Sequence, residues 1–128
     1  MSINKNTILT SQEIEHKIKR IAYQIYETFV DKEEVVIAGI ASNGFIFAKK
    51  IAEALNAIST LKVSLCEVRI NKQKPESAVT TSLFEEEYTN KGLVLVDDVL
   101  NSGTTLIYAV RHFLDVPLKK FKTAVLVD

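Results

Sequence analysis

The fold is decided by the stretch Gly92-Leu93-Val94-Leu95-Val96-Asp97-Asp98-Val99-Leu100-Asn101-Ser102-Gly103-Thr104-Thr105. Four apolar residues, 93–96, predict a buried strand that ends at two carboxylates, Asp97 and Asp98. A loop with hydroxyl groups and one glycine follows, and apolar residues then recur at helical spacing over 106–114. The loop and the helix N-terminus can donate hydrogen bonds to a phosphate, and the carboxylates can accept them from sugar hydroxyls. The alternative for this pattern is an ordinary parallel strand that ends in an acidic turn.

A second unit of the same kind lies earlier in the chain. Val35–Ile40 is a continuous apolar run that predicts a buried strand, and a helix is predicted over about 45–55. Between them lies the loop Ala41-Ser42-Asn43-Gly44, in which Gly44 is expected to approach a ligand closely or adopt a positive φ. Ligands of such folds bind at the carboxyl ends of the strands, so both loops are expected at one edge of the sheet. Taken alone, this loop fits a plain strand-to-helix turn better than a binding loop.

The remaining pattern predicts an α/β fold. Thr10-Ser11-Gln12-Glu13 fits a capping box that opens an amphipathic helix over about 11–30. Further strands are predicted over Leu61–Ile70, Val79–Phe84 and Thr123–Val127, with a polar excursion at 71–81 and a solvated acidic run at 85–87. We therefore expect a mostly parallel sheet of about five strands, flanked by three main helices, in which the section 61–92 forms an antiparallel hairpin.

Composition and charge narrow the class of protein. The 128 residues predict a single domain over 1–128, and 47% hydrophobic with 25% charged residues is ordinary for a soluble protein. Lys+Arg and Asp+Glu are 16 each, which argues against a strongly basic nucleic-acid binder. The single cysteine, Cys66, is expected in the core. Residues 1–10 lack the apolar centre of a signal peptide, and no apolar run suits a membrane span, so we expect a cytoplasmic protein.

The whole chain resembles the type I phosphoribosyltransferases. Val94–Thr105 is similar to their long signature for phosphoribosyl pyrophosphate (PRPP). Within the family the chain looks most like the bifunctional pyrimidine operon regulators with uracil phosphoribosyltransferase activity. The segments that support this branch are Ile8-Leu9, Ile37–Ile40 leading to Gly44, Ala48–Ala52 and Ala124–Asp128.

The resemblance assigns roles to particular residues. Asp97 and Asp98 are the acidic pair expected to bind the ribose hydroxyls and to stabilise charge on the sugar, which is the catalytic role. The loop at 101–105 is expected to hold the 5′-phosphate, and the loop at 41–44 is expected to hold the pyrophosphate. Lys72 and Lys74 lie in the region of a loop that is expected to close over the site. Mg²⁺ is expected to ride on PRPP rather than on side chains. The residues expected to bind substrate are Ala41, Ser42, Asn43, Gly44, Lys72, Val99, Leu100, Asn101, Ser102, Gly103, Thr104 and Thr105.

The implied reaction is displacement of pyrophosphate from PRPP by a nucleobase nitrogen through an oxocarbenium-like transition state, with uracil or another pyrimidine favoured. Three departures qualify it. Ala41 and Asn43 stand where the similar regulators carry basic residues, which predicts weaker binding of the diphosphate. Asn101 stands where the hypoxanthine-guanine branch has a catalytic Asp, which disfavours that branch. The chain stops at Asp128, earlier than family members, so we expect either a truncated or unusually short form or a base-binding wall that comes from elsewhere.

Three other functions compete with the enzyme. A PRPP- or nucleotide-sensing regulator with weak or no catalysis is the main alternative, because of Ala41 and Asn43. RNA binding rests on analogy alone, and zero net charge gives it no support. A phospho-acceptor receiver domain would place an acidic pair after the first strand, where this chain has Ala41-Ser42-Asn43. The partners expected are PRPP, a nucleobase and further copies of the chain in a homodimer or larger assembly, with no membrane.

Overall fold

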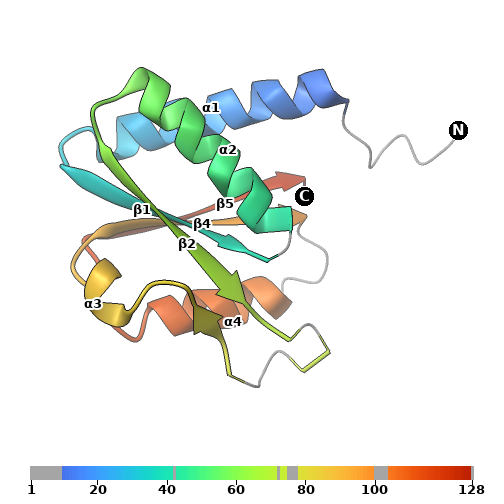
Figure 1. Ribbon diagram of the computed structural model, residues 1–128, viewed down its shortest axis with the longest axis vertical. Coiled ribbons are helices and arrows are strands. Elements are labelled where there is room, and N and C mark those ends of the chain that lie inside the picture. Colours follow the sequence, from blue (N-terminus) through green and yellow to red (C-terminus); the bar gives the residue numbers. More distant parts are fainter. Residues whose placement is uncertain (1–9, 42, 72, 75–77, 100–103, 128) are drawn as a thin grey trace, which may run out of the picture.

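The computed structural model describes residues 10–41, 43–71, 73–74, 78–99 and 104–127. Helices and strands alternate along these residues, which is the arrangement of an α/β fold. The elements in chain order are α1 Ser11–Phe29, β1 Glu34–Ile40, α2 Asn43–Ile58, β2 Lys62–Arg69, β3 Thr80–Thr81, α3 Glu85–Tyr88, β4 Gly92–Val99, α4 Thr104–Phe113 and β5 Lys120–Val127 (Figure 1).

The five strands form one sheet in the order β3-β2-β1-β4-β5. β1 is the central strand and pairs in parallel with β2 and β4, while β4 pairs in parallel with β5. β3 is antiparallel to β2, so the section 61–92 does contain the predicted hairpin. The predicted mostly parallel sheet with three main helices is thereby confirmed, and α3 is a single additional turn.

Helices cover both faces of the sheet (Figure 1). α1 and α2 pack over one face, where Ile37 and Val94 belong to their hydrophobic core. α3 and α4 lie on the other face, over a core that includes Leu93 and Leu95. Burial on both faces explains why β1 and β4 read as continuous apolar runs rather than alternating ones. None of the helices within the described residues is long and apolar enough to span a membrane.

The start of α1 follows the sequence prediction closely. The backbone N–H of Glu13 donates to Thr10 Oγ1 at 3.1 Å, and the backbone N–H of Thr10 donates to Glu13 Oε1 at 2.9 Å. This reciprocal pair is the predicted capping box, and it lowers the pKa of Glu13, chiefly through the bond from the Thr10 backbone. The apolar stripe behind it is buried, at Ile18, Ile21, Ala22, Ile25 and Phe29.

Several element boundaries differ from the sequence prediction, and the strand predicted over Val79–Phe84 is limited to Thr80–Thr81. β5 begins at Lys120 rather than Thr123, and Lys120 pairs with Gly92 of β4. Its Nζ donates to the Thr28 carbonyl at 3.2 Å and lies 6.0 Å from the centroid of the Phe29 ring. α2 begins at Asn43, so part of the predicted loop is helical. The acidic run at 85–87 is exposed as predicted, but it forms the first turn of α3.

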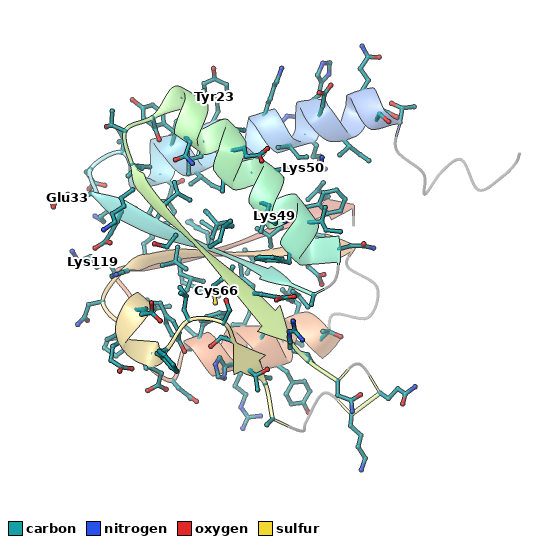
Figure 2. All side chains as sticks on the ribbon, viewed as in Figure 1. Tyr23, Glu33, Lys49, Lys50, Cys66 and Lys119 are labelled. Atoms are coloured by element: carbon teal, nitrogen blue, oxygen red, sulfur yellow. The ribbon has the colours of Figure 1, made fainter. Side chains whose placement is uncertain are left out.

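The core on the α4 side contains the cysteine. Cys66 is fully buried, as predicted, and burial raises the pKa of its thiol (Figure 2). Tyr88 is also buried, and its ring meets Phe113 edge to face with centroids 5.1 Å apart. Burial raises the pKa of the Tyr88 hydroxyl as well. Two ionisable groups therefore sit neutral in an apolar layer.

Candidate functional site

The two predicted loops begin at the same edge of the sheet. β1 and β4 are parallel neighbours, and Gly39 is in register with Val96. The chain leaves β1 at Ala41 to start α2, and it continues past Asp97 toward α4. Figure 1 shows the starts of α2 and α4 at the same end of the sheet, on opposite faces. A ligand at this edge can therefore contact both units.

Asp97 is the buried charged side chain of the described residues, with 7% of its surface exposed. It lies inside β4, in register with Val125 of β5, although the sequence analysis placed it after the end of the strand. Burial of a carboxylate costs free energy unless polar groups compensate it. Its position at the carboxyl edge places that costly charge where the ribose of a ligand was predicted to bind.

Gly44 connects the two loops. It is buried in the first turn of α2, and a Cβ atom there would lie 2.8 Å from the Val96 carbonyl oxygen and 3.3 Å from Asp97 Cα. Gly44 is not among the residues with a positive φ. Of the two alternatives predicted for Gly44, the positive φ is not adopted. The close approach of its backbone is made to the end of β4, and only glycine allows α2 to start that near to Asp97.

Ala41 has already used its backbone donor. Its N–H donates to the Val68 carbonyl at 2.8 Å and thereby extends the ladder between β1 and β2. Asn43 is exposed in the first turn of α2, where no acidic residue occurs. An anion at this position would meet the positive end of the helix dipole. Ala41 itself contributes neither a charge nor its backbone N–H.

The other predicted residues are only partly described. Thr105 is half-buried in the first turn of α4, and the backbone of Asp98 and Val99 continues β4. The side chains of Asp98, Val99 and Thr104 lie outside the description. The predicted residues that fall outside the described residues altogether are Ser42, Lys72, Leu100, Asn101, Ser102 and Gly103.

The end of β2 contributes two charges to this edge. Arg69 donates to Glu67 at 3.2 Å between Nη2 and Oε1. They belong to the strand predicted over Leu61–Ile70, and the sequence pattern does not indicate which residues of β1 lie beside them. No group of three or more potential metal ligands occurs among the residues with a described structure.

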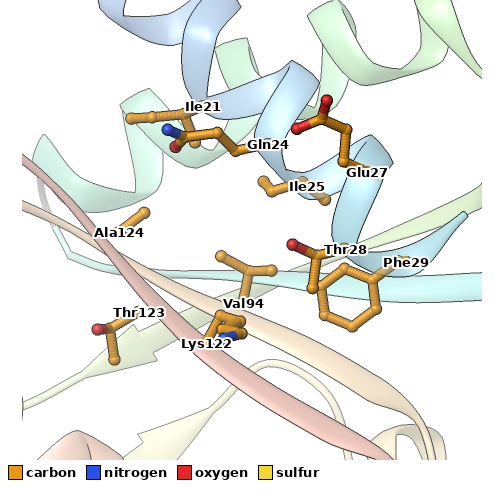
Figure 3. Close-up of a pocket in the computed structure, with 10 residues that line it drawn as sticks. All are labelled: Ile21, Gln24, Ile25, Glu27, Thr28, Phe29, Val94, Lys122, Thr123 and Ala124. Carbon is orange, nitrogen blue, oxygen red and sulfur yellow. The ribbon is translucent and has the colours of Figure 1, made fainter.

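A cavity of about 310 Å³ lies away from this edge, between the second half of α1 and strands β4 and β5 (Figure 3). Apolar Ile25 and Val94 and polar Gln24 and Glu27 contribute to its lining. The predicted site residues that the structure describes do not line it. The cavity is therefore separate from the edge that Asp97 and Gly44 share.

Comparison with known proteins agrees with this arrangement. Residues 4–128 match the model of the phosphoribosyl transferase domain. The chain is 32% identical to the bifunctional protein PyrR of Brevibacillus brevis, over 98% of this chain and 75% of that protein. It is 32% identical to the bifunctional protein PyrR of Streptococcus pneumoniae, over 79% of this chain and 60% of that protein. The chain thus aligns with 60% and 75% of the lengths of these two curated relatives.

Solved structures share the fold. A hypoxanthine-guanine phosphoribosyltransferase of Bacillus anthracis is 23% identical, with a TM-score of 0.71 over 93% of this chain and 68% of that one. The hypoxanthine phosphoribosyltransferase of Trypanosoma cruzi is 20% identical, with a TM-score of 0.76 over 93% of this chain and 69% of that one. At these identities the likeness shows the fold alone. From the family model and the PyrR relatives, the chain belongs to the phosphoribosyl transferase domain family.

Proposed function

We propose that this protein transfers the ribose-5-phosphate of PRPP to a nucleobase and releases pyrophosphate. The observation that carries the proposal is the close approach of Gly44 to the carboxyl end of β4, where Asp97 is buried. This contact brings the start of α2, the predicted pyrophosphate side, against the predicted ribose side. PRPP carries its diphosphate on C1 of the ribose, so its two recognition groups must lie next to each other.

Each part of the edge has a task in this reaction. Asp97 and Asp98 accept hydrogen bonds from the ribose hydroxyls and offset the positive charge that develops on the sugar. The loop at 101–105 holds the 5′-phosphate at the start of α4, and the loop at 41–44 holds the pyrophosphate at the start of α2. The bond from C1 to the pyrophosphate oxygen breaks and the electron pair leaves with pyrophosphate, a base nitrogen bonds to C1, and the proton of that nitrogen passes to the released pyrophosphate. A closing loop that contains Lys72 excludes water, which would otherwise hydrolyse PRPP.

The carboxylate at the edge suits a magnesium complex of PRPP. Hard oxygen donors are the ligands that Mg²⁺ prefers, and Mg²⁺ is usually held by one or two carboxylates together with substrate phosphates. The phosphate and ribose oxygens of PRPP would hold this ion, and the negative charges of Asp97 and Asp98 would lie next to it at the ribose. The bound ion would lower the charge on the departing pyrophosphate.

A pyrimidine, uracil first, is the acceptor we propose. The similarity of Val94–Thr105 and the flanking segments to the pyrimidine operon regulators supports it, as does Asn101 in place of a catalytic Asp. The hypoxanthine-type structures share only the fold with this chain and do not bear on the base. A homodimer or larger assembly is part of the same proposal, and light scattering of the purified protein measures it.

The test is release of pyrophosphate from PRPP and Mg²⁺ with uracil, cytosine, hypoxanthine and guanine as acceptors. We expect turnover with uracil and a loss of at least about 100-fold in the variant with Asp97→Asn and Asp98→Asn, because two charges facing the transition state are removed. Asp115→Asn, an exposed aspartate after α4, is the matched control and should keep the activity. Full activity in the double variant would refute the assigned roles.

A PRPP-sensing regulator without turnover is the second candidate. It is favoured by Ala41, which has no charged side chain and whose N–H is engaged by Val68. Calorimetry that detects PRPP binding, together with no pyrophosphate release for any base, would select this function. Failure to bind PRPP or any nucleoside monophosphate would reject both candidates.

A further inference from the structure

The start of α2 has no basic side chain of its own at Ala41 or Asn43, yet a diphosphate needs positive charge nearby. The neighbouring strand supplies one. β1 and β2 are parallel with Ile40 in register with Val68, and the bond from Ala41 N to the Val68 carbonyl continues this register by one residue. Ala41 therefore lies beside Arg69, at the usual spacing of about 4.8 Å between strands.

Arg69 also lies on the side of the sheet that α2 covers. A Cβ at Gly39 would meet the Gly44 carbonyl oxygen, Phe45 Cα and Ala48 Cβ, so that side of β1 faces the start of α2. Glu67 is in register with Gly39, and side chains in register on adjacent parallel strands point to the same face. Arg69, two residues after Glu67, shares that face. The Arg69 side chain therefore leaves the carboxyl end of β2 on the face of the sheet that α2 covers.

The strand that carries Arg69 is fixed on both sides. Arg69 pairs with Thr80 of β3, and Ala41 lies on its other side. The Glu67 backbone N–H donates to Ser82 Oγ at 2.8 Å, and the Ser82 N–H donates to the Glu67 carbonyl at 2.9 Å. Reorientation of Arg69 thus needs only a change of side-chain rotamer.

The guanidinium is held by a contact that a diphosphate can replace. The distance between Arg69 Nη2 and Glu67 Oε1 is 3.2 Å. The Arg69 side chain is 72% exposed, and the Glu67 side chain is 25% exposed. Ion pairs at such exposed positions are weak. Arginine binds phosphate oxygens through two parallel hydrogen bonds, which a single contact to a carboxylate oxygen does not match.

We propose that Arg69 binds the diphosphate of PRPP at the start of α2, and that Glu67 holds the guanidinium when no ligand is bound. The inference rests on the proposed function and names the cation of its pyrophosphate side. Arg69 supplies the positive charge that the side chains of Ala41 and Asn43 do not have. Glu67 acts as an internal competitor that lowers the affinity for PRPP.

The test is calorimetric titration of the full chain with PRPP, pyrophosphate and ribose 5-phosphate, each in the presence of Mg²⁺. In Arg69→Gln we expect PRPP and pyrophosphate to bind at least about tenfold more weakly, which is the range for a lost charge-assisted hydrogen bond. Ribose 5-phosphate has no diphosphate, so its affinity should stay unchanged. Arg69→Lys should recover part of the loss, and Glu67→Gln should tighten PRPP binding a fewfold.

Arg111→Gln, the same change at an exposed arginine in the last turn of α4, is the matched control and should bind all three ligands like the wild type. The inference is overturned if Arg69→Gln binds PRPP as tightly as the wild type does, or if the substitution weakens the binding of ribose 5-phosphate as much as that of PRPP. It is also overturned if Glu67→Gln weakens the binding of PRPP. A wild type that binds neither PRPP nor ribose 5-phosphate would reject the proposed function instead.

Discussion

Asp97 is a residue that the packing of the sheet alone does not explain. Its neighbours along β4, Leu93–Val96, are fully buried apolar side chains, and an aspartate in their place normally reduces stability. Buried charged groups occur both in structural networks and at functional sites. The position of Asp97 at the carboxyl end of β4 is therefore consistent with the ribose-binding role that we propose.

Because of Tyr88 and Cys66, we expect the free energy of unfolding to decrease as the pH becomes alkaline. Burial raises the pKa of both groups in the folded state, so the unfolded chain ionises first as pH rises. Their contribution is complete at neutral pH and is lost above the ordinary pKa values of about 8.5 for a thiol and 10 for a phenol. Each group can lower the free energy of unfolding by up to about 1.4 kcal/mol per pH unit. Urea unfolding at pH 8 and 10.5 measures this loss.

Tyr88→Phe isolates the tyrosine contribution, because it removes the hydroxyl and keeps the ring against Phe113. We expect this variant to lose less stability between pH 8 and 10.5 than the wild type. Tyr23→Phe removes a hydroxyl from a side chain that is 55% exposed and should lose as much as the wild type. An equal loss in Tyr88→Phe and the wild type would contradict the argument.

At the scale of elements, the position of α2 depends on the absence of a side chain at Gly39. A Cβ there would lie 2.5 Å from both the Gly44 carbonyl oxygen and Phe45 Cα, and these backbone atoms cannot rotate away. We expect Gly39→Ala to lower the free energy of unfolding by about 1–3 kcal/mol, the range for overpacked cores. It should also weaken PRPP binding, because the start of α2 must move from Asp97. Urea unfolding and calorimetry measure the two effects.

The matched control for Gly39→Ala is Ala57→Ser, which adds one atom at an exposed position near the end of α2. It should change the free energy of unfolding by less than about 0.5 kcal/mol and leave PRPP binding unchanged. Unchanged stability in Gly39→Ala would show that α2 does not press on β1 as closely as the structure has it.

The elements that could be predicted from the sequence are those with a strong local signal. Continuous apolar runs gave β1 and β4, and a capping box with a 3.6-residue stripe gave α1. The start of β5 at Lys120 was missed, because the lysines at 120 and 122 look polar in a sequence pattern, whereas Lys120 pairs with Gly92 and its Nζ is bound to the Thr28 carbonyl of α1. α3 was missed because one turn is too short for periodicity.

The candidate site was predictable only in outline. Topology places the carboxyl ends of parallel strands together, so the shared edge of Ala41 and Asp97 followed from the pattern of elements. The register between strands is a tertiary property, and no local pattern indicates that Arg69 lies beside Ala41 or that Val68 takes the Ala41 N–H. The helical first turn at Gly44 was missed for the same reason, because its cause is the approach to β4.

In the whole molecule, the helices that follow the two predicted binding loops lie on opposite faces of one sheet. α2 packs with α1 on one face, and α4 lies on the other, over a separate hydrophobic core. The first turn of α2 reaches the carboxyl end of β4 at Gly44, next to Asp97. A ligand that contacts the starts of both helices would therefore link the two layers at this end of the sheet.

This arrangement predicts how three ligands protect the backbone from hydrogen exchange. PRPP should slow exchange at the first turns of both α2 and α4, because its diphosphate and its 5′-phosphate bind one loop each. Ribose 5-phosphate should protect only the start of α4, and pyrophosphate only the start of α2. At 100 times its dissociation constant, PRPP should raise the free energy of unfolding by about 2.7 kcal/mol. Protection by PRPP at one helix alone would show that the two loops do not form a single site.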